Sequence, residues 1–178
     1  PWDDDSVSWD RYVEPVLARY CGTCHRGKGK GRKTLDLAPR PGRLGFDEAY
    51  WLFTGRPAWG RPYKPPANPP PGFGIAGMLM VEGYGRRDPA GYRTPEPMSA
   101  LSYGSRLVEI ASSGTHHDVK VDAESLRRLI LWVDTMCPYR GSEEIRRLPD
   151  PEFQGVDWLA VRPRIRTAPR VRGTGPVG

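Results

Sequence analysis

Long apolar runs are missing from this chain, and cysteine and histidine are scarce. The longest uninterrupted apolar stretch, Leu129 to Val133, falls far short of the roughly 18 residues that a membrane-spanning helix needs. The three cysteines among 178 residues form an odd and sparse set, whereas small secreted disulfide scaffolds carry an even and denser one. The sequence therefore predicts neither an integral membrane protein nor a disulfide-stapled fold.

Proline and glycine, by contrast, are abundant, with 20 and 21 residues respectively. Both interrupt helices and strands, so much of the backbone is expected to be loop. Six tryptophans and eight tyrosines supply large apolar contacts for a small core or around a flat cofactor. The net charge is +6, but basic and acidic residues are mixed along most of the chain, and no nucleic-acid-binding motif accompanies the charge. We therefore predict a mainly α fold with extensive irregular loops, and no nucleic-acid partner.

One short motif points to a cofactor. Cys21-Gly22-Thr23-Cys24-His25 has the C-x-x-C-H form by which haem c is attached to proteins. Two thiols on one turn reach the two vinyl groups of a haem as thioethers, and the imidazole of the next residue then points at the iron. The sequence thus predicts one covalent haem c, held by Cys21 and Cys24, with His25 as an iron ligand.

Two other interpretations use the same cysteines. A zinc knuckle would combine Cys21 and Cys24 with His116 and His117, although structural zinc sites usually place the second ligand pair at a regular short spacing. A redox-active dithiol would lie at the start of a helix within a βαβ unit, and the sequence around Cys21 shows no such pattern. Haem attachment is therefore favoured.

Apolar side chains at steps of three and four predict several helices. The first covers residues 7–20 and leads directly into the cysteine motif. Pro15 is expected to kink it, or to confine its regular part to one side, because proline interrupts the hydrogen-bond ladder of a helix. Shorter helices are expected over residues 46–53 and 105–111.

The strongest helical pattern covers residues 121–136. Asp122 is expected to cap its first turn, and Glu124 and Arg128, four residues apart, are expected to pair. Its apolar face is traced by Leu126, Leu129, Ile130 and Val133. This helix is expected to pack against the core.

Three segments lack a regular pattern. Residues 26–33 form a basic glycine-rich loop without the spacing of a phosphate-binding loop; we expect it to be solvated or to contact haem propionates or an acidic redox partner. Residues 55–100 form a long Pro/Gly-rich insertion, expected to wrap the cofactor, to form a partner surface or to be partly mobile. Residues 142–178 form an extended Arg/Pro-rich tail, expected to dock through Trp158, Leu159 and Val161. The haem domain is accordingly assigned to residues 1–141.

An amphipathic helix before C-x-x-C-H, a long irregular section and a final amphipathic helix are similar to the plan of class I cytochromes c. Several motifs resemble a narrower group, the C-terminal c-type haem domain of the hydrazine synthase alpha subunit and its relatives in planctomycetes. These motifs are Tyr12-Val13-Glu14-Pro15-Val16-Leu17, Leu101-Ser102-Tyr103-Gly104-Ser105, His116-His117-Asp118-Val119-Lys120-Val121, the helix Leu126 to Asp134, and Cys137-Pro138-Tyr139-Arg140-Gly141. The resemblance spans about residues 8 to 165.

This resemblance implies a cytochrome c-like domain whose haem is bis-histidine ligated and moves electrons, while the hydrazine-forming chemistry takes place on haems elsewhere in the complex. Carried over to this sequence, His25 is the proximal ligand and His116 the distal one. His117 is equally able to coordinate, and Met98 would be the thioether ligand of a higher-potential cytochrome. Cys137, at a helix end, is expected to be a buried apolar residue rather than a nucleophile.

The sequence therefore predicts a mono-haem c-type cytochrome domain that carries electrons to redox partner proteins, within a larger complex. Haem attachment through C-x-x-C-H normally follows export, so an extracytoplasmic compartment such as the periplasm is expected. A haem enzyme with an open distal site, hydrazine-synthase-like or peroxidase-like, would instead use Tyr63, His117 and Asp118 around the iron. A docking module whose haem mainly holds the fold is the third hypothesis. Electron transfer is favoured over catalysis by this chain alone, and no catalytic residue is predicted.

Overall fold

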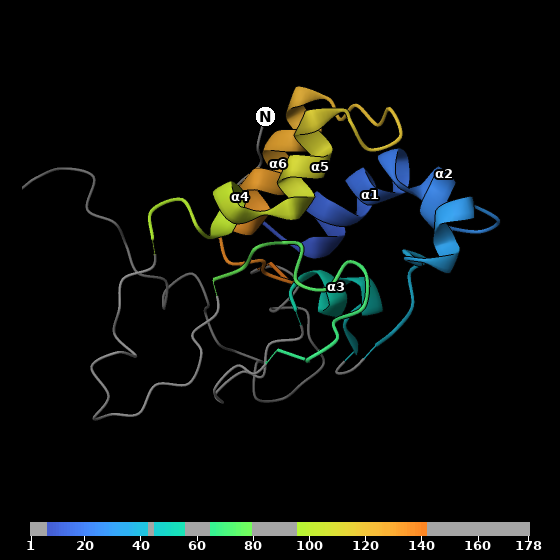
Figure 1. Cartoon of the computed structure of the whole chain (residues 1–178), viewed down its shortest axis with the longest axis horizontal. Helices are drawn as coiled ribbons and strands as arrows, with labels where there is room; N and C mark the ends of the chain where they lie inside the picture. The colour runs from blue at the N-terminus through green and yellow to red at the C-terminus, as the bar shows by residue number, and fades with distance from the viewer. Residues whose placement is uncertain (1–6, 43–44, 56–64, 80–95, 142–178) are drawn as a thin grey trace, which may run out of the picture.

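The fold is mainly helical with long irregular connections, as expected (Figure 1). The computed structural model describes residues 7–42, 45–55, 65–79 and 96–141. Within these residues the one β-bridge pairs Pro41 with Asp47. In the same part of the chain, no helix combines the length and the apolar content that crossing a lipid bilayer requires.

Some of the sequence-based expectations fall on other parts of the chain. The tail with its proposed anchors Trp158, Leu159 and Val161 lies outside the described residues, as do residues 56–64 and 80–95 of the Pro/Gly-rich insertion. The division into a domain of 1–141 and a tail of 142–178 therefore stays a prediction.

The segment before the cysteine motif forms two helical pieces rather than one kinked helix. A π-helical turn, η1 (Trp9–Val13), is followed by α1 (Glu14–Tyr20), and α2 (Gly22–His25) then carries the motif. Pro15 lies in the first turn of α1, where a missing N–H is tolerated because it has no partner inside the helix. The regular helix therefore lies on the C-terminal side of this proline, and α1 leads straight into the cysteines.

The last helix, α6 (Ala123–Asp134), matches the strongest helical pattern of the sequence. The carboxylate of Asp122 caps it by accepting a hydrogen bond from the backbone N–H of Ser125 at 2.9 Å. The expected ion pair is also present, with 3.4 Å between Nε of Arg128 and Oε1 of Glu124. Both local predictions are thus confirmed.

The buried face of α6 differs from the predicted one. Trp132 is completely buried, whereas Ile130 is only half-buried. The indole Nε1 of Trp132 donates a hydrogen bond to the carbonyl oxygen of Pro138 at 3.0 Å, so its polar atom is satisfied within the core. The face that the sequence traced with Leu126, Leu129, Ile130 and Val133 is therefore shifted: Leu129 and Val133 are buried, and Trp132 is buried with them.

Two short helices precede α6. These are α4 (Leu101–Gly104) and α5 (Arg106–Ser113), and Ser105 between them caps α5 by accepting from the N–H of Val108 at 3.3 Å. The same buried hydroxyl donates to the carbonyl oxygen of Ile75 at 3.2 Å. The helix predicted over 105–111 is therefore present, and its cap also binds the irregular chain beside it.

The helix expected over 46–53 is present as α3 (Glu48–Phe53). Residues 73–77 of the Pro/Gly-rich insertion run beside it. The N–H of Gly74 donates to the last turn of α3 at 2.8 Å, and the N–H of Leu107 in α5 donates to Ile75 at 2.8 Å. This part of the insertion therefore joins α3 to α5 without forming a strand.

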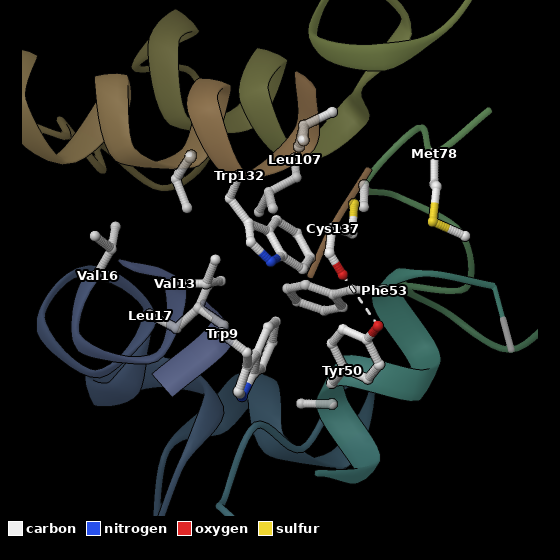
Figure 2. Close-up of a cluster of buried hydrophobic side chains, with 14 of the residues drawn as sticks. Trp9, Val13, Val16, Leu17, Tyr50, Phe53, Met78, Leu107, Trp132 and Cys137 are labelled. Atoms are coloured by element: carbon white, nitrogen blue, oxygen red, sulfur yellow. Dashed lines mark hydrogen bonds between the residues drawn. The ribbon is translucent and has the colours of Figure 1, made fainter. Parts of the chain in front are cut away.

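The core is organised by aromatic rings (Figure 2). The rings of Tyr50, Phe53 and Trp132 lie 5.7, 6.0 and 5.4 Å from that of Trp9, measured between ring centroids. Such edge-on contacts bury much apolar surface with few residues. The hydroxyl of Tyr50 donates to the carbonyl oxygen of Cys137 at 3.0 Å, shown as a dashed line in Figure 2. The core thus joins η1, α3 and the end of α6.

Cys137 is a buried residue, as predicted. Only 1 % of its surface is exposed, and burial raises the pKa of its thiol to about 12. A thiol that stays protonated is a poor nucleophile. Cys137 is therefore part of the core.

Candidate functional site

An apolar cavity of about 240 Å³ lies between the cysteine motif, α5 and the start of α6. Its walls come from most of the fold and include Leu17, Leu37, Phe53, Ile75, Leu107 and Leu129. The residues of the C-x-x-C-H motif and the pair His116 and His117 line the same cavity. The structure therefore brings together residues that are about 90 positions apart in the sequence.

Cys21 and Cys24 both reach the cavity from a single helical turn. The N–H of Cys24 and that of His25 donate to the carbonyl oxygen of Cys21, at 3.2 and 2.9 Å. Both thiols are free of disulfide bonds. Burial raises the pKa of the Cys21 thiol, while Cys24 is exposed. One sulfur therefore lies within the apolar wall and the other at its rim.

His25 is held by a backbone contact that selects one of its nitrogens. Its Nδ1 donates to the carbonyl oxygen of Leu35 at 2.9 Å, so Nε2 is left as the nitrogen with a free lone pair. Histidine ligands of metal ions are oriented in this way, by a second hydrogen bond on the other ring nitrogen. The neighbouring N–H of Leu37 donates to the carbonyl oxygen of His25 at 2.9 Å, which ties the same segment to the motif.

The glycines of the basic loop make this contact possible. A Cβ atom on Gly31 would lie 2.8 Å from Cε1 of His25, and one on Gly29 would lie 2.2 Å from the carbonyl oxygen of Cys24. Neither distance is allowed for a side chain, so the loop approaches the motif closely only because both residues are glycine. The sequence predicted a loop that is solvated or contacts haem propionates or an acidic partner; it missed both this packing role and the 3-10 helix η2 (Lys30–Lys33). The alternation of glycine with lysine or arginine immediately after the motif was the available signal.

His116 lies on the connection between α5 and α6, far from the C-x-x-C-H motif in the sequence. Its ring centroid is 6.1 Å from that of His25, and the two ring planes differ by 13°. Two imidazoles bound to one metal ion at about 2 Å each have centroids about 6 Å apart, so this spacing fits a metal between them. Burial lowers the pKa of His116, with smaller effects of His117, His25 and Arg106. A neutral imidazole is the form that ligates a metal.

The turn that carries His116 has an unusual backbone. His117 and Asp118 have positive φ angles of 49° and 59°, and Gly114 at the end of α5 has φ of 67°. Consecutive left-handed residues other than glycine are strained, and such strain is concentrated at functional sites. The N–H of Val119 donates to the carbonyl oxygen of His116 at 3.0 Å, which closes the turn.

The two alternative ligands are placed differently. His117 is exposed, lines the cavity, and has its ring centroid 4.9 Å from that of His116. Met98 is 67 % exposed and lines a separate depression beside Tyr103 and Asp134. The structure therefore brings His25, His116 and His117 together and does not bring Met98 to them. Of the enzyme candidates, Tyr63 lies outside the described residues, and Asp118 is not among the residues that line the cavity.

The donor set fits a haem better than a bare ion. Within the described residues no group of three or more His, Cys, Asp or Glu side chains is arranged to hold a metal ion. A structural zinc site needs four protein ligands. In a haem the porphyrin nitrogens already bind the iron, so the protein supplies only the axial ligands. Two facing imidazoles in an apolar cavity, with two thiols at one edge, are compatible with that requirement.

No family model, curated protein or solved structure matches the chain. The resemblance to the hydrazine synthase haem domain accordingly rests on the sequence motifs alone.

Proposed function

We propose that this chain contains a mono-haem c-type cytochrome domain, with a cytochrome c-like arrangement of its first and last helices, that carries electrons through a bis-histidine haem. The observation that supports this proposal best is the pair of nearly parallel imidazole rings of His25 and His116, 6.1 Å apart beside Cys21 and Cys24. No other pair of side chains in the described part of the site offers this combination of spacing and chemistry.

Each residue of the site has a task in this proposal. Cys21 and Cys24 would hold the haem as thioethers, and His25 and His116 would ligate its iron. Bound in this way, the haem supplies a one-electron iron couple. The hydrogen bond from Nδ1 of His25 to Leu35 fixes the proximal ring, and the apolar wall excludes water. Electron transfer needs rigid ligands and a shielded haem ring, and these two features of the chain support the proposal.

The second imidazole also favours electron transfer over the alternatives. A haem enzyme needs an open position for its substrate, and His116 as a second ligand would remove that position. The extracytoplasmic compartment is proposed because covalent haem attachment normally follows export, and redox partner proteins within a larger complex are proposed from the resemblance. A docking module, whose haem would mainly hold the fold, would bind its complex without exchanging electrons through the iron.

Covalent attachment is tested by acid extraction. The protein is produced in cells that carry a haem c attachment system, denatured, and treated with acidified acetone. The wild-type polypeptide should retain its haem, and the double variant Cys21→Ala/Cys24→Ala should lose it. Release of the haem from the wild-type protein, or a preparation that contains zinc and no iron, would contradict the proposal.

The axial ligands are tested by absorption spectra with and without carbon monoxide. The wild type should be low spin and should bind carbon monoxide poorly when reduced, whereas His116→Ala should become high spin and bind it readily. Met98→Leu is the matched control, because Met98 lies away from the cavity, and it should leave both spectra unchanged. A sulfur-to-iron charge-transfer band in the oxidised wild type, lost in Met98→Leu, would exclude the bis-histidine assignment.

A further inference from the structure

A single carboxylate joins the cysteine-bearing helix to the segment that carries His116. The hydroxyl of Tyr20 donates to Oδ2 of Asp122, a contact between residues 102 positions apart. Nη1 of Arg19 lies 3.6 Å from the same oxygen. Ser125 donates to this carboxylate as well, from its N–H at 2.9 Å and from its Oγ at 2.8 Å. Asp122 therefore accepts hydrogen bonds from α1 and from α6 at once.

Tyr20 and Asp122 each lie next to a segment that carries proposed haem-binding residues. Tyr20 immediately precedes Cys21 and lines the cavity. Asp122 immediately follows residues 114–121, the connection that holds His116. A hydrogen bond between them thus joins the segment next to the proximal ligand to the segment that carries the distal one. Figure 1 shows the connection between α5 and α6 above α1.

Apart from the packing of Val121 against the core, the connection has few contacts in the described residues that fix its position. Its hydrogen bonds are local: Oγ of Ser113 lies 2.9 Å from Oγ1 of Thr115, and the N–H of Val119 reaches only as far back as His116. Val119 and Val121 face an apolar cavity, which offers no directional contact. Two residues with positive φ, His117 and Asp118, keep this backbone conformation only where the surroundings hold the turn, so its ends need to be anchored.

We infer that Asp122, acting through Tyr20, is a positioning residue that sets the distance between His25 and His116. The inference rests on the proposed bis-histidine function. The carboxylate suits this task because it accepts several hydrogen bonds while charged, and bonds to an ionised acceptor are stronger than neutral ones. Loss of the Tyr20 hydroxyl leaves the cap of α6 intact and weakens the link to α1, because only the exposed ion pair of Arg19 with Asp122 remains, so that His116 leaves its position more often.

The test compares two variants that each remove one hydrogen bond to the same carboxylate. Tyr20→Phe removes the bond between α1 and Asp122, whereas Ser125→Ala removes a side-chain bond within the first turn of α6. Carbon monoxide is mixed with the reduced holoprotein, and its binding rate reports how often His116 dissociates. Tyr20→Phe should raise this rate about tenfold, and Ser125→Ala should change it by less than about twofold. Thermal unfolding of both variants serves as the stability control.

The outcomes separate the inference from the function on which it rests. Equal rates in the wild type and Tyr20→Phe, or an equal increase in Ser125→Ala, would overturn the positioning role while leaving bis-histidine ligation in place. Rapid carbon monoxide binding by the wild type would instead contradict the bis-histidine site and both conclusions with it. Asp122→Asn is the second variant, and it retains a capping side chain. Its amide oxygen can still accept from the Tyr20 hydroxyl, so the rate of carbon monoxide binding should increase less than in Tyr20→Phe.

Discussion

Nδ1 of His25 lies 2.9 Å from the carbonyl oxygen of Leu35, and this hydrogen bond leaves Nε2 as the nitrogen available for a ligand bond. The contact depends on how closely the loop after the motif approaches the imidazole. Gly31 is at the point of closest approach, because a Cβ there would lie 2.8 Å from Cε1 and 3.0 Å from Nδ1 of the ring. The loop after the motif therefore determines the orientation of the His25 ring.

The first prediction concerns this approach. Gly31→Ala should displace the ring or the loop, lower the free energy of unfolding by about 1–3 kcal/mol, and shift the reduction potential of the holoprotein. Urea unfolding and a redox titration measure the two effects. Gly22→Ala is the control within the motif, since its Cβ would have no neighbour nearer than 3.5 Å. An unchanged potential in Gly31→Ala would show that the loop does not orient the ligand.

The second prediction is a count of reactive thiols. The chain has three cysteines; if Cys21 and Cys24 are thioethers, one thiol is left, and it is the buried Cys137. A thiol reagent should therefore find no reactive group in native holoprotein and one after denaturation. The protein made without haem should show three when denatured. Three reactive thiols in denatured holoprotein would rule out the thioether bonds.

The third prediction concerns acid stability at Asp36. Its carboxylate accepts from Nε of Arg32 at 2.9 Å and from the N–H of Ala38 at 3.0 Å, and with Arg40 nearby these contacts lower its pKa to about 2. A lowered pKa in the folded state means that the stabilisation is complete above the ordinary value near 3.8 and is lost as the pH falls toward 2.

Denaturant unfolding of the wild type and Asp36→Asn at several pH values tests this dependence. The wild type should be the more stable at pH 5, and the difference between the two free energies of unfolding should shrink as the pH approaches 2. A difference that stays constant over this range would mean that the ion pairs of Asp36 do not stabilise the fold, as is common for exposed pairs.

The fourth prediction concerns the aromatic core. Trp132→Phe loses both ring volume and the hydrogen bond to Pro138, and should lower the free energy of unfolding by about 1–3 kcal/mol. The exposed Tyr103, with 73 % of its surface accessible, is the matched aromatic control, and Tyr103→Leu should change stability by less than about 0.5 kcal/mol. Similar losses in both variants would place the core elsewhere.

Local signals in the sequence were sufficient for the longer helices and for the motif itself, whereas α4 and the 3-10 helix over Lys30–Lys33 were not predicted. Asp122 and Ser105 cap their helices because a short polar side chain reaches the first free N–H groups, and this depends only on nearby residues. The interruption at Pro15 has an equally local cause. The assignment of the cofactor from Cys21, Cys24 and His25 stays a prediction of the same local kind.

Contacts between distant segments were beyond the reach of these signals. Nothing in the periodicity of α6 distinguishes Ile130 from Trp132, because the choice depends on the ring of Trp9 that packs against it. The role of Gly31 depends in the same way on where His25 lies. The hydrogen bond from Tyr20 to Asp122 joins two segments that are far apart in the sequence. The proximity of His116 to His25 was implied by resemblance, and the ring spacing is a property of the fold.

The hydrogen bond from the N–H of Trp9 to the carbonyl oxygen of Tyr139, at 3.1 Å, joins residues 130 positions apart. A contact of this kind closes almost the whole described chain into one loop, and the entropy cost of that closure grows with its length. Helices as short as these form within about a microsecond. We therefore expect the folding rate to be set by the search that brings the two ends together, with the individual helices contributing little delay.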